Sequence, residues 1–132
     1  MKKFTIHSDG GARGNPGPAA IGAILVSSDG NCIEIISKTI GKKTNNQAEY
    51  EAIIAALELA KNLKADELDC YLDSELVVKQ INHQYKVKNK ELAPLFLKVH
   101  NLCLQFKKIK FHHVPREKNK AADKLVNEAL DG

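Results

Sequence analysis

Two aspartates stand where short strands are expected to end, a place where carboxylates can bind a cation or a proton. Asp9 follows the β-rich run FTIHS, and Asp73 follows LDCYL. If these strands are parallel neighbours, their ends lie about 4.8 Å apart, and open α/β sheets bind ligands beyond the carboxyl ends of parallel strands. Two aspartates there repel each other unless a positive charge lies between them. The pair therefore predicts a cation site at one edge of a sheet.

Glu49 lies on a helix face where a carboxylate is unexpected. The helix expected over 44–63 carries apolar residues at the core-facing spacing counted from Glu49, namely Ala52, Ile53, Ala56, Ala60 and Leu63. Burying an unpaired carboxylate on this stripe costs several kcal/mol or forces it to take up a proton. Either Glu49 joins the two aspartates, or the first turn of the helix overhangs the sheet and the carboxylate reaches water or favours the helix N-terminus.

Asp123 is the fourth candidate. It lies one turn inside the final helix, beside an apolar stripe, and from there it can lean over a neighbouring site. Taken alone, it is better explained as an acid near the positive end of the helix dipole. A site made of these four carboxylates would offer oxygen ligands without clustered His or Cys, which favours magnesium or manganese over zinc.

The pattern of apolar and turn residues predicts one domain over residues 1–132. In chain order we expect strands at 3–8, 20–28 and 32–40, a helix at 44–63, a strand at 68–72, helices at 74–85 and 91–106, a strand at 109–114 and a helix at 119–130. Asp29-Gly30 suits a hairpin turn, Thr44 and Gln47 can form a capping box, and Asn119 can cap the last helix. The order βββαβααβα implies an α/β fold with a five-stranded mixed sheet flanked by helices, in which right-handed crossovers join the parallel strands.

Composition places few limits on function. The net charge is +4, and lysines bunch at 86–90, 107–110 and 118–124, which attracts a polyanion but also suits a solvated surface. Cys32, Cys70 and Cys103 lack metal-ligand spacing, so we expect three reduced, buried hydrophobes. No apolar run approaches the ~20 residues of a membrane span, and the N-terminus does not resemble a signal peptide. We therefore expect a cytoplasmic monomer without a membrane partner.

The glycine-rich stretch from Gly10 to Pro18 matches neither the GxGxxG nor the Walker phosphate-binding pattern. Its bare backbone amides and Asn15 could still touch a sugar-phosphate backbone. From its shape alone, a tight connection between two strands is the better interpretation.

At these same residues the chain resembles ribonucleases H of type 1. The matching segments run through nearly the whole chain in order: Asp9-Gly10-Gly11, Gly14–Pro18, Thr44–Glu49, Asp73-Ser74 and Asn119–Asp123. The combination is highly specific, although no single piece is. The resemblance implies an endonuclease that hydrolyses the RNA strand of RNA–DNA hybrids and leaves 5′-phosphate and 3′-hydroxyl ends. It also assigns the family's catalytic, metal-binding carboxylates to Asp9, Glu49, Asp73 and Asp123.

The resemblance further implies a two-metal mechanism and a set of substrate contacts. Two Mg²⁺ or Mn²⁺ ions roughly 4 Å apart would activate water and steady the leaving 3′-oxygen. The implied nucleic-acid contacts are Gly10, Gly11, Asn15, Thr44, Asn45, Gln47 and Ser74. The asparagines and the glutamine fall where the family touches the minor groove of the hybrid, the glycine amides would meet 2′-hydroxyls, and the threonine falls on a phosphate contact.

Two departures from the family pattern concern how the substrate is handled. Many members carry a histidine in the loop before the last aspartate, where this chain reads PREK at 115–118. His113 lies in the apolar strand IKFHHV, so we propose Arg116 for the loop, where it can hold a phosphate but cannot carry protons near neutral pH. Some members also have a basic, aromatic-rich insert. Here only residues 86–90 join two helices, which predicts weaker and more salt-sensitive hybrid binding.

Two other functions compete with this interpretation. A non-enzymatic module of the same fold would bind nucleic acid without cutting it, although a pure binder gains nothing from clustered carboxylates near phosphates. The chain could also be another nuclease of the same broad superfamily, such as a junction resolvase or an exonuclease.

Overall fold

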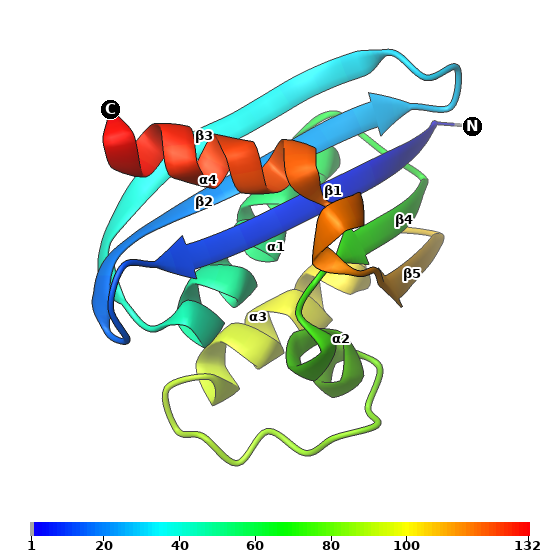
Figure 1. The fold of residues 1–132 in the computed structure, drawn as a ribbon. Coiled ribbons are helices and arrows are strands. Elements are labelled where there is room, and N and C mark those ends of the chain that lie inside the picture. Colours follow the sequence, from blue (N-terminus) through cyan, green and yellow to red (C-terminus); the bar gives the residue numbers. More distant parts are fainter. Residues whose placement is uncertain (1) are drawn as a thin grey trace.

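The computed structural model describes residues 2–132 and contains a five-stranded mixed sheet with helices on both faces (Figure 1). The strands are β1 (Lys3–Ala12), β2 (Gly17–Ser27), β3 (Cys32–Lys43), β4 (Glu67–Leu72) and β5 (Lys108–His113). The helices are α1 (Asn45–Asn62), α2 (Glu75–Ile81), α3 (Ala93–Cys103) and α4 (Lys120–Asp131), with a 3₁₀ turn, η1, at Arg116–Lys118. The sheet order is β3-β2-β1-β4-β5; β2 is antiparallel to β1 and β3, whereas β4 is parallel to β1 and β5. The predicted architecture is confirmed.

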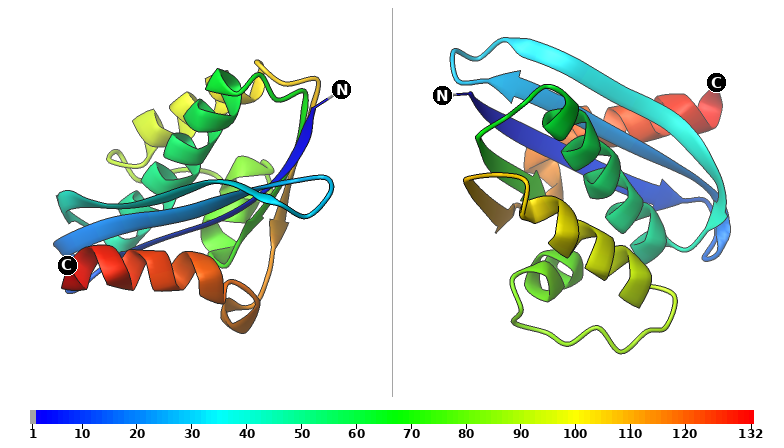
Figure 2. Two further views of the ribbon diagram at one scale, coloured as in Figure 1. Left: turned by 90° about the horizontal axis from the view of Figure 1, so that it is seen from above. Right: turned by 180° about the vertical axis from the view of Figure 1, so that it is seen from behind.

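The sheet separates two unequal helical layers. α1, α2 and α3 pack on one face, and α4 lies across β1, β2 and β3 on the other (Figure 2). The main core lies in the first layer, where Ile6 and Leu25 of the sheet cluster with Ile53 of α1, each 0% exposed. Because successive strand residues point to opposite faces, Gly10 of β1 faces α1 and Gly11 faces α4.

β1 does not end before Asp9, as the sequence pattern predicted, but continues to Ala12. Its parallel pairing with β4 stops at Ser8, opposite Leu72. Its antiparallel pairing with β2 runs on through Asp9, opposite Gly22. Asp9 therefore marks the place where β1 extends beyond β4. The prediction that the first and fourth strands are parallel neighbours is confirmed.

Glycines near this extension allow helices to approach the sheet closely. A Cβ on Gly10 would lie 2.1 Å from the carbonyl oxygen of Ala48 in α1, and a Cβ on Gly22 would lie 2.5 Å from that of Ala122 in α4. Backbone packed this tightly leaves no room for a side chain. Glycines also interrupt the β pattern after Asp9, which is why the sequence placed the end of the first strand too early.

The start of α1 agrees with the sequence prediction, whereas the end of α2 does not. The capping box is confirmed, because Gln47 N donates to Thr44 Oγ1 (3.1 Å) and Thr44 N donates to Gln47 Oε1 (2.8 Å). α2 ends at Ile81 rather than near Tyr85. The chain leaves the helix at His83, where φ is 63°, a left-handed conformation that ends helices.

The cysteines differ from the prediction of three buried residues. Cys70 is buried in β4 and Cys103 is half-buried in α3, but Cys32 is exposed at the start of β3. The side chains of β3 are mostly exposed, and Cys32 at its start lies outside the core cluster.

Candidate active site

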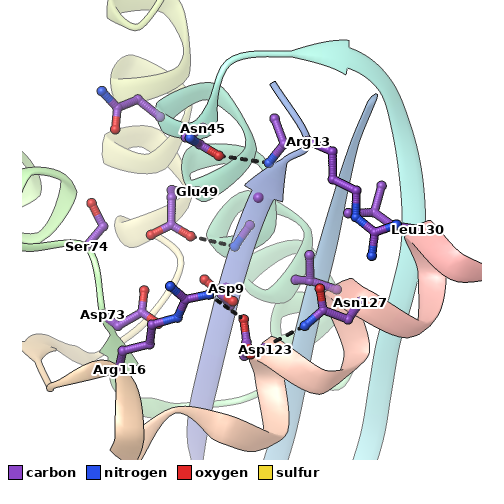
Figure 3. Close-up of a pocket in the computed structure, with 15 residues that line it drawn as sticks. Asp9, Arg13, Asn45, Glu49, Asp73, Ser74, Arg116, Asp123, Asn127 and Leu130 are labelled. Carbon is purple, nitrogen blue, oxygen red and sulfur yellow. Dashed lines mark hydrogen bonds and ion pairs between the residues drawn. The ribbon is translucent and has the colours of Figure 1, made fainter. Parts of the chain in front are cut away.

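Three predicted carboxylates converge where β1 extends beyond β4. Asp9 comes from β1, Glu49 from α1 and Asp73 from the residue after β4, and Figure 3 shows them around one pocket. One carboxylate oxygen of each residue lies within 4.8 Å of the other two. Asp9 and Glu49 are each 8% exposed. This acidic trio is an oxygen-rich centre of the kind that suits a hard divalent cation.

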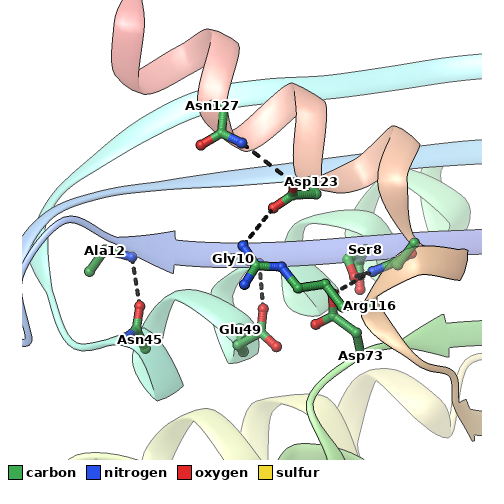
Figure 4. Close-up of polar contacts among 10 residues, drawn as sticks. Ser8, Gly10, Ala12, Asn45, Glu49, Asp73, Arg116, Asp123 and Asn127 are labelled. Atoms are coloured by element: carbon green, nitrogen blue, oxygen red, sulfur yellow. Dashed lines mark hydrogen bonds and ion pairs between the residues drawn. The ribbon is translucent and has the colours of Figure 1, made fainter.

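Glu49 is held in place by the backbone of β1. Gly10 N donates a hydrogen bond to Glu49 Oε1 at 2.5 Å (Figure 4). The contact is possible because Gly10 has no side chain to keep α1 away from the strand. Glu49 is therefore buried against the sheet, which excludes the alternative in which the first turn of the helix overhangs into water.

Burial and like charge make the acidic trio electrostatically unfavourable on its own. Burial, together with the charges of Asp73 and Asp123, raises the pKa of Asp9 to about 7. Burial and the neighbouring charge of Asp9 also raise the pKa of Glu49 well above its ordinary value. Asp9 therefore retains a proton to near-neutral pH, and Glu49 is harder to ionise than an ordinary glutamate, unless a positive charge is supplied.

Asp123 lies beside the acidic trio, in the first turn of α4. Its charge contributes to the raised pKa of Asp9. Its oxygens accept hydrogen bonds from Arg116 Nη2 (3.5 Å) and Asn127 Nδ2 (3.4 Å), as Figure 4 shows. The fold thus brings all four predicted carboxylates to the lining of one pocket.

Asn119 connects three parts of this site, a role that the sequence did not indicate. We expected a helix cap, but its side chain makes no capping hydrogen bond. Its amide instead donates to the Ser8 carbonyl oxygen (2.9 Å) and to Asp73 Oδ2 (3.4 Å), and the residue is 2% exposed. Asn119 therefore ties the start of α4 to β1 and to Asp73. An asparagine that caps a helix and one that is buried look alike in sequence, so only the fold distinguishes them.

The four carboxylates open into a pocket of about 540 Å³. Predicted contacts that line it are Gly10, Gly11, Asn45, Ser74 and Arg116. The sequence reasoning missed Arg13, Asn127 and Leu130, which line the end of the pocket away from Arg116 (Figure 3). Arg13 lies within the glycine-rich stretch but resembles any loop cation, Leu130 lies beyond the last motif, and only Asn127 carried a signal in its spacing of four residues after Asp123.

The remaining predicted contacts, and Asn45 of the pocket lining, have hydrogen-bond partners within the protein. Asn15 Oδ1 accepts from Asn45 N (2.9 Å), and Asn45 Oδ1 accepts from Ala12 N (2.8 Å), so these two asparagines join the β1–β2 turn to α1. Thr44 and Gln47 are the two halves of the capping box. All four residues therefore fix the start of α1 next to the pocket.

Of the candidates for the loop before the last aspartate, Arg116 lies at the pocket and the histidines do not. Arg116 lies in η1 and reaches Asp123, with 79% of its side chain exposed. His113 is exposed at the end of β5 and is not part of the pocket lining. His112, one residue earlier, pairs with Asp69 at 2.9 Å. The prediction that both histidines are strand residues is confirmed.

Known proteins of similar sequence cover the full length of the fold. Residues 7–129 match the family model described as reverse transcriptase-like. A ribonuclease H of Clostridium botulinum is 37% identical, over 99% of this chain and 97% of that protein. Mycobacterial relatives that are 44% identical are longer proteins, and the chain spans 36% of their length.

Two solved structures share the fold in detail. RNase H1 of the halophilic archaeon Halobacterium salinarum has a TM-score of 0.95 at 43% identity, over 98% of each chain. LC11-RNase H1, isolated from compost and crystallised in complex with an RNA/DNA hybrid, has a TM-score of 0.92 at 44% identity, over 97% of this chain and 96% of that chain. With its sheet order, its acidic pocket and these full-length similarities, the chain belongs to the ribonuclease H family.

Proposed function

We propose that the protein is a metal-dependent endoribonuclease that hydrolyses the RNA strand of RNA–DNA hybrids and leaves 5′-phosphate and 3′-hydroxyl ends. The observation that carries this proposal is the acidic trio with Asp123 beside it, four carboxylates from separate elements in one pocket. Membership of the ribonuclease H family supports it, and LC11-RNase H1 is a relative that binds an RNA/DNA hybrid. In a protein that only bound nucleic acid, this cluster would lower the affinity, because carboxylates repel phosphates.

The acidic trio fits a hard divalent cation, and we propose Mg²⁺ or Mn²⁺ as the cofactor. The group consists of carboxylates alone, a donor set that suits these ions better than zinc. A cation also offsets the burial and the like charges that together raise the pKa of Asp9. Asp9, Glu49, Asp73 and Asp123 would hold two ions when substrate is present. Bound there, the ions supply activation of water and neutralisation of the leaving 3′-oxygen.

The protein's own residues orient the carboxylates and the strand to be cut. Asn119 donates to Asp73 and fixes its direction, and Arg116 reaches Asp123 from η1. A guanidinium so placed can exchange the carboxylate for a substrate phosphate. The nucleic-acid contacts that we propose are Gly10, Gly11, Asn15, Thr44, Asn45, Gln47 and Ser74.

A cleavage assay with a labelled RNA–DNA hybrid tests the function directly. We expect cleavage with Mg²⁺ or Mn²⁺, none with EDTA, and products with 5′-phosphate ends. Double-stranded RNA, double-stranded DNA and branched DNA serve as parallel substrates, and Asp73→Asn is the inactive control. Cutting of branched DNA in preference to the hybrid would identify a resolvase instead, and no cleavage with any metal would leave a binding module.

Arg116→Ala tests the loop residue. Loss of a charge-assisted hydrogen bond to phosphate should slow turnover about tenfold, and Arg116→Lys should restore part of the rate. Lys118→Ala, in the same 3₁₀ turn, is the matched control and should leave turnover unchanged. If Arg116→Ala cleaves as fast as the wild type, Arg116 has no place in the mechanism.

We also propose a cytoplasmic monomer that has no membrane partner. The pocket is lined by residues of one chain, so a second copy is not needed to complete it. Within residues 2–132, no helix combines the length and the apolar character needed to cross a bilayer. Three free cysteines, one of them exposed, suit a reducing compartment. Light scattering of the purified protein tests the monomer.

A further inference from the structure

Two arginines stand at opposite ends of the catalytic pocket, and each is tied to an acid of α4. Arg116 Nη2 lies 3.5 Å from Asp123 Oδ1, and Arg13 Nη2 lies 2.7 Å from Asp131 Oδ1. Asp123, Asn127 and Asp131 follow one another at intervals of four residues, so they share one face of the helix. At 1.5 Å per residue, the two acids are about 12 Å apart. Figure 3 shows Arg13 beside Leu130, at the far end from Arg116.

The pair of Arg13 and Asp131 is exposed and easily exchanged. Half of the Arg13 side chain and 64% of the Asp131 side chain are exposed. Ion pairs this exposed add little to folding stability, so the pair is not needed to hold α4 on the sheet. A phosphate offers the guanidinium the same bidentate geometry as a carboxylate. The carboxylate of Asp131 can therefore act as a stand-in for a phosphate.

Arg13 also lies between two hollows of opposite character. With Leu130 it lines both the catalytic pocket and a neighbouring hollow of about 630 Å³. The charged side chains of this second hollow, among the described residues, are Arg13 and Lys42, both positive. The catalytic pocket carries four carboxylates. A polyanionic strand that leaves the catalytic pocket in this direction passes from acidic to basic surroundings, and Arg13 is the first cation it meets.

We propose that Arg13 binds a backbone phosphate of the nucleic acid, a few nucleotides from the phosphate that is cleaved, and that Asp131 holds the guanidinium until the phosphate displaces it. The proposal rests on the proposed function in one respect, that a nucleic-acid strand crosses the catalytic pocket. Arg13 is held at Asp131, about 12 Å along α4 from Asp123, so it contributes to binding rather than to chemistry. Asp131 competes with the substrate, and its removal strengthens binding.

A double-mutant cycle tests the exchange of partners. Binding of a hybrid is measured by fluorescence anisotropy as a function of salt, with Asp9→Asn in every protein so that the hybrid stays intact. Arg13→Gln should weaken binding about tenfold and reduce the slope of log K against log salt by about 1. Asp131→Asn should tighten binding severalfold, and this gain should disappear in the double variant. Additive effects, or an unchanged salt slope, would overturn the proposal.

A matched ion pair elsewhere controls for charge alone. Lys98 and Glu58 lie 3.8 Å apart between α3 and α1, with 56% and 50% of their side chains exposed. Lys98→Gln and Glu58→Gln change the net charge by the same amounts but lie outside the pocket lining. We expect both to leave hybrid affinity unchanged. If Lys98→Gln lowers hybrid affinity as much as Arg13→Gln does, net charge alone explains the effect and the proposal is overturned.

Hybrids with one neutral methylphosphonate linkage locate the contact. At one linkage, neutralisation should weaken hybrid binding by the protein that carries Asp9→Asn alone but not by the protein that also carries Arg13→Gln. At every other linkage, neutralisation should change the affinity of both proteins equally. If the wild type cuts no hybrid while this signature persists, the proposed function fails and the phosphate site stands. If the wild type cuts the hybrid and no linkage gives the signature, the phosphate site fails alone.

Discussion

The position of Asp9 is unfavourable for the stability of the metal-free protein, because its carboxyl group is buried among other acids. Its pKa is about 7 in the folded protein, against an ordinary value of 3.8. Between these values the folded, metal-free protein keeps a proton that the unfolded chain has released. The contribution of Asp9 to stability is therefore greatest at or below pH ~4 and falls as the pH rises toward 7. A bound cation removes this penalty by favouring the ionised form.

Asp9→Asn should separate the two effects. In EDTA at pH 7, the free energy of unfolding of the variant should exceed that of the wild type by about 1–4 kcal/mol, and the difference should shrink toward pH 4. Urea titrations at both pH values measure it, and hybrid cleavage should be abolished. A variant less stable than the wild type at pH 7 would show that Asp9 is structural.

Replacing Asn119 should disturb the site through the two hydrogen bonds that its side chain donates. Asn119→Ala leaves the Ser8 carbonyl without its amide donor and frees Asp73, which should cost about 1–3 kcal/mol of stability. Calorimetry should also show weaker Mn²⁺ binding, which a purely structural role would not predict once the protein is folded. Asn101→Ala, on the exposed side of α3, is the control and should change stability by less than ~0.5 kcal/mol. Unchanged Mn²⁺ affinity in Asn119→Ala would remove Asn119 from the site.

Among the elements, the contact of α1 with β1 sets the geometry of the acidic trio. Two adjacent glycines test it. Gly10→Ala puts a Cβ 2.1 Å from the Ala48 carbonyl oxygen, so α1 must move and carry Glu49 with it. Gly11→Ala meets Val126 at an ordinary 3.5 Å. We expect Gly10→Ala to lose several kcal/mol of stability and nearly all cleavage, and Gly11→Ala to fold normally. Equal stability of the two variants in urea would contradict this packing.

The same elements show how far sequence reasoning reaches. Helix and strand order, the capping box at Thr44 and the parallel pairing of β1 with β4 were predictable, because apolar period and turn chemistry are local signals. The end of β1 was not, because its last residues are held by pairing with β2 rather than by their own preference. α2 likewise stops at Ile81 because the chain turns at His83, and neither Gly nor Pro, the strongest turn signals, is present there.

In the site, sequence analysis identified charged residues at positions where apolar residues or plain turns are expected. Glu49 on a core stripe and aspartates after strands stand out in this way. Asn119 and Arg13 did not, because a buried asparagine resembles a cap and an arginine in a loop resembles any surface charge. Their roles depend on contacts with Ser8 and Asp131, 111 and 118 residues away along the chain (119 minus 8, and 131 minus 13). Such contacts exist only in the folded molecule.

For the whole molecule, the proposed metal site predicts that folding is coupled to metal binding. Ions that bind only the folded state stabilise it by mass action, by about 2.7 kcal/mol at 100 times Kd. Mg²⁺ or Mn²⁺ should therefore raise the melting temperature by several degrees, and NaCl at equal ionic strength should not. Asp73→Asn should lose most of the shift. An equal shift in that variant would place the stabilising ions elsewhere on the surface.

The spacing of the four carboxylates along the chain determines when the site can be completed during synthesis. During synthesis, Asp73 leaves the ribosome fifty residues before Asp123 (123 minus 73). Until then the nascent chain lacks α4, and the Asn119 amide that fixes Asp73 is absent as well. The proposed function therefore predicts that a chain that has emerged only through β5, with three of its four acids, does not yet cleave the hybrid.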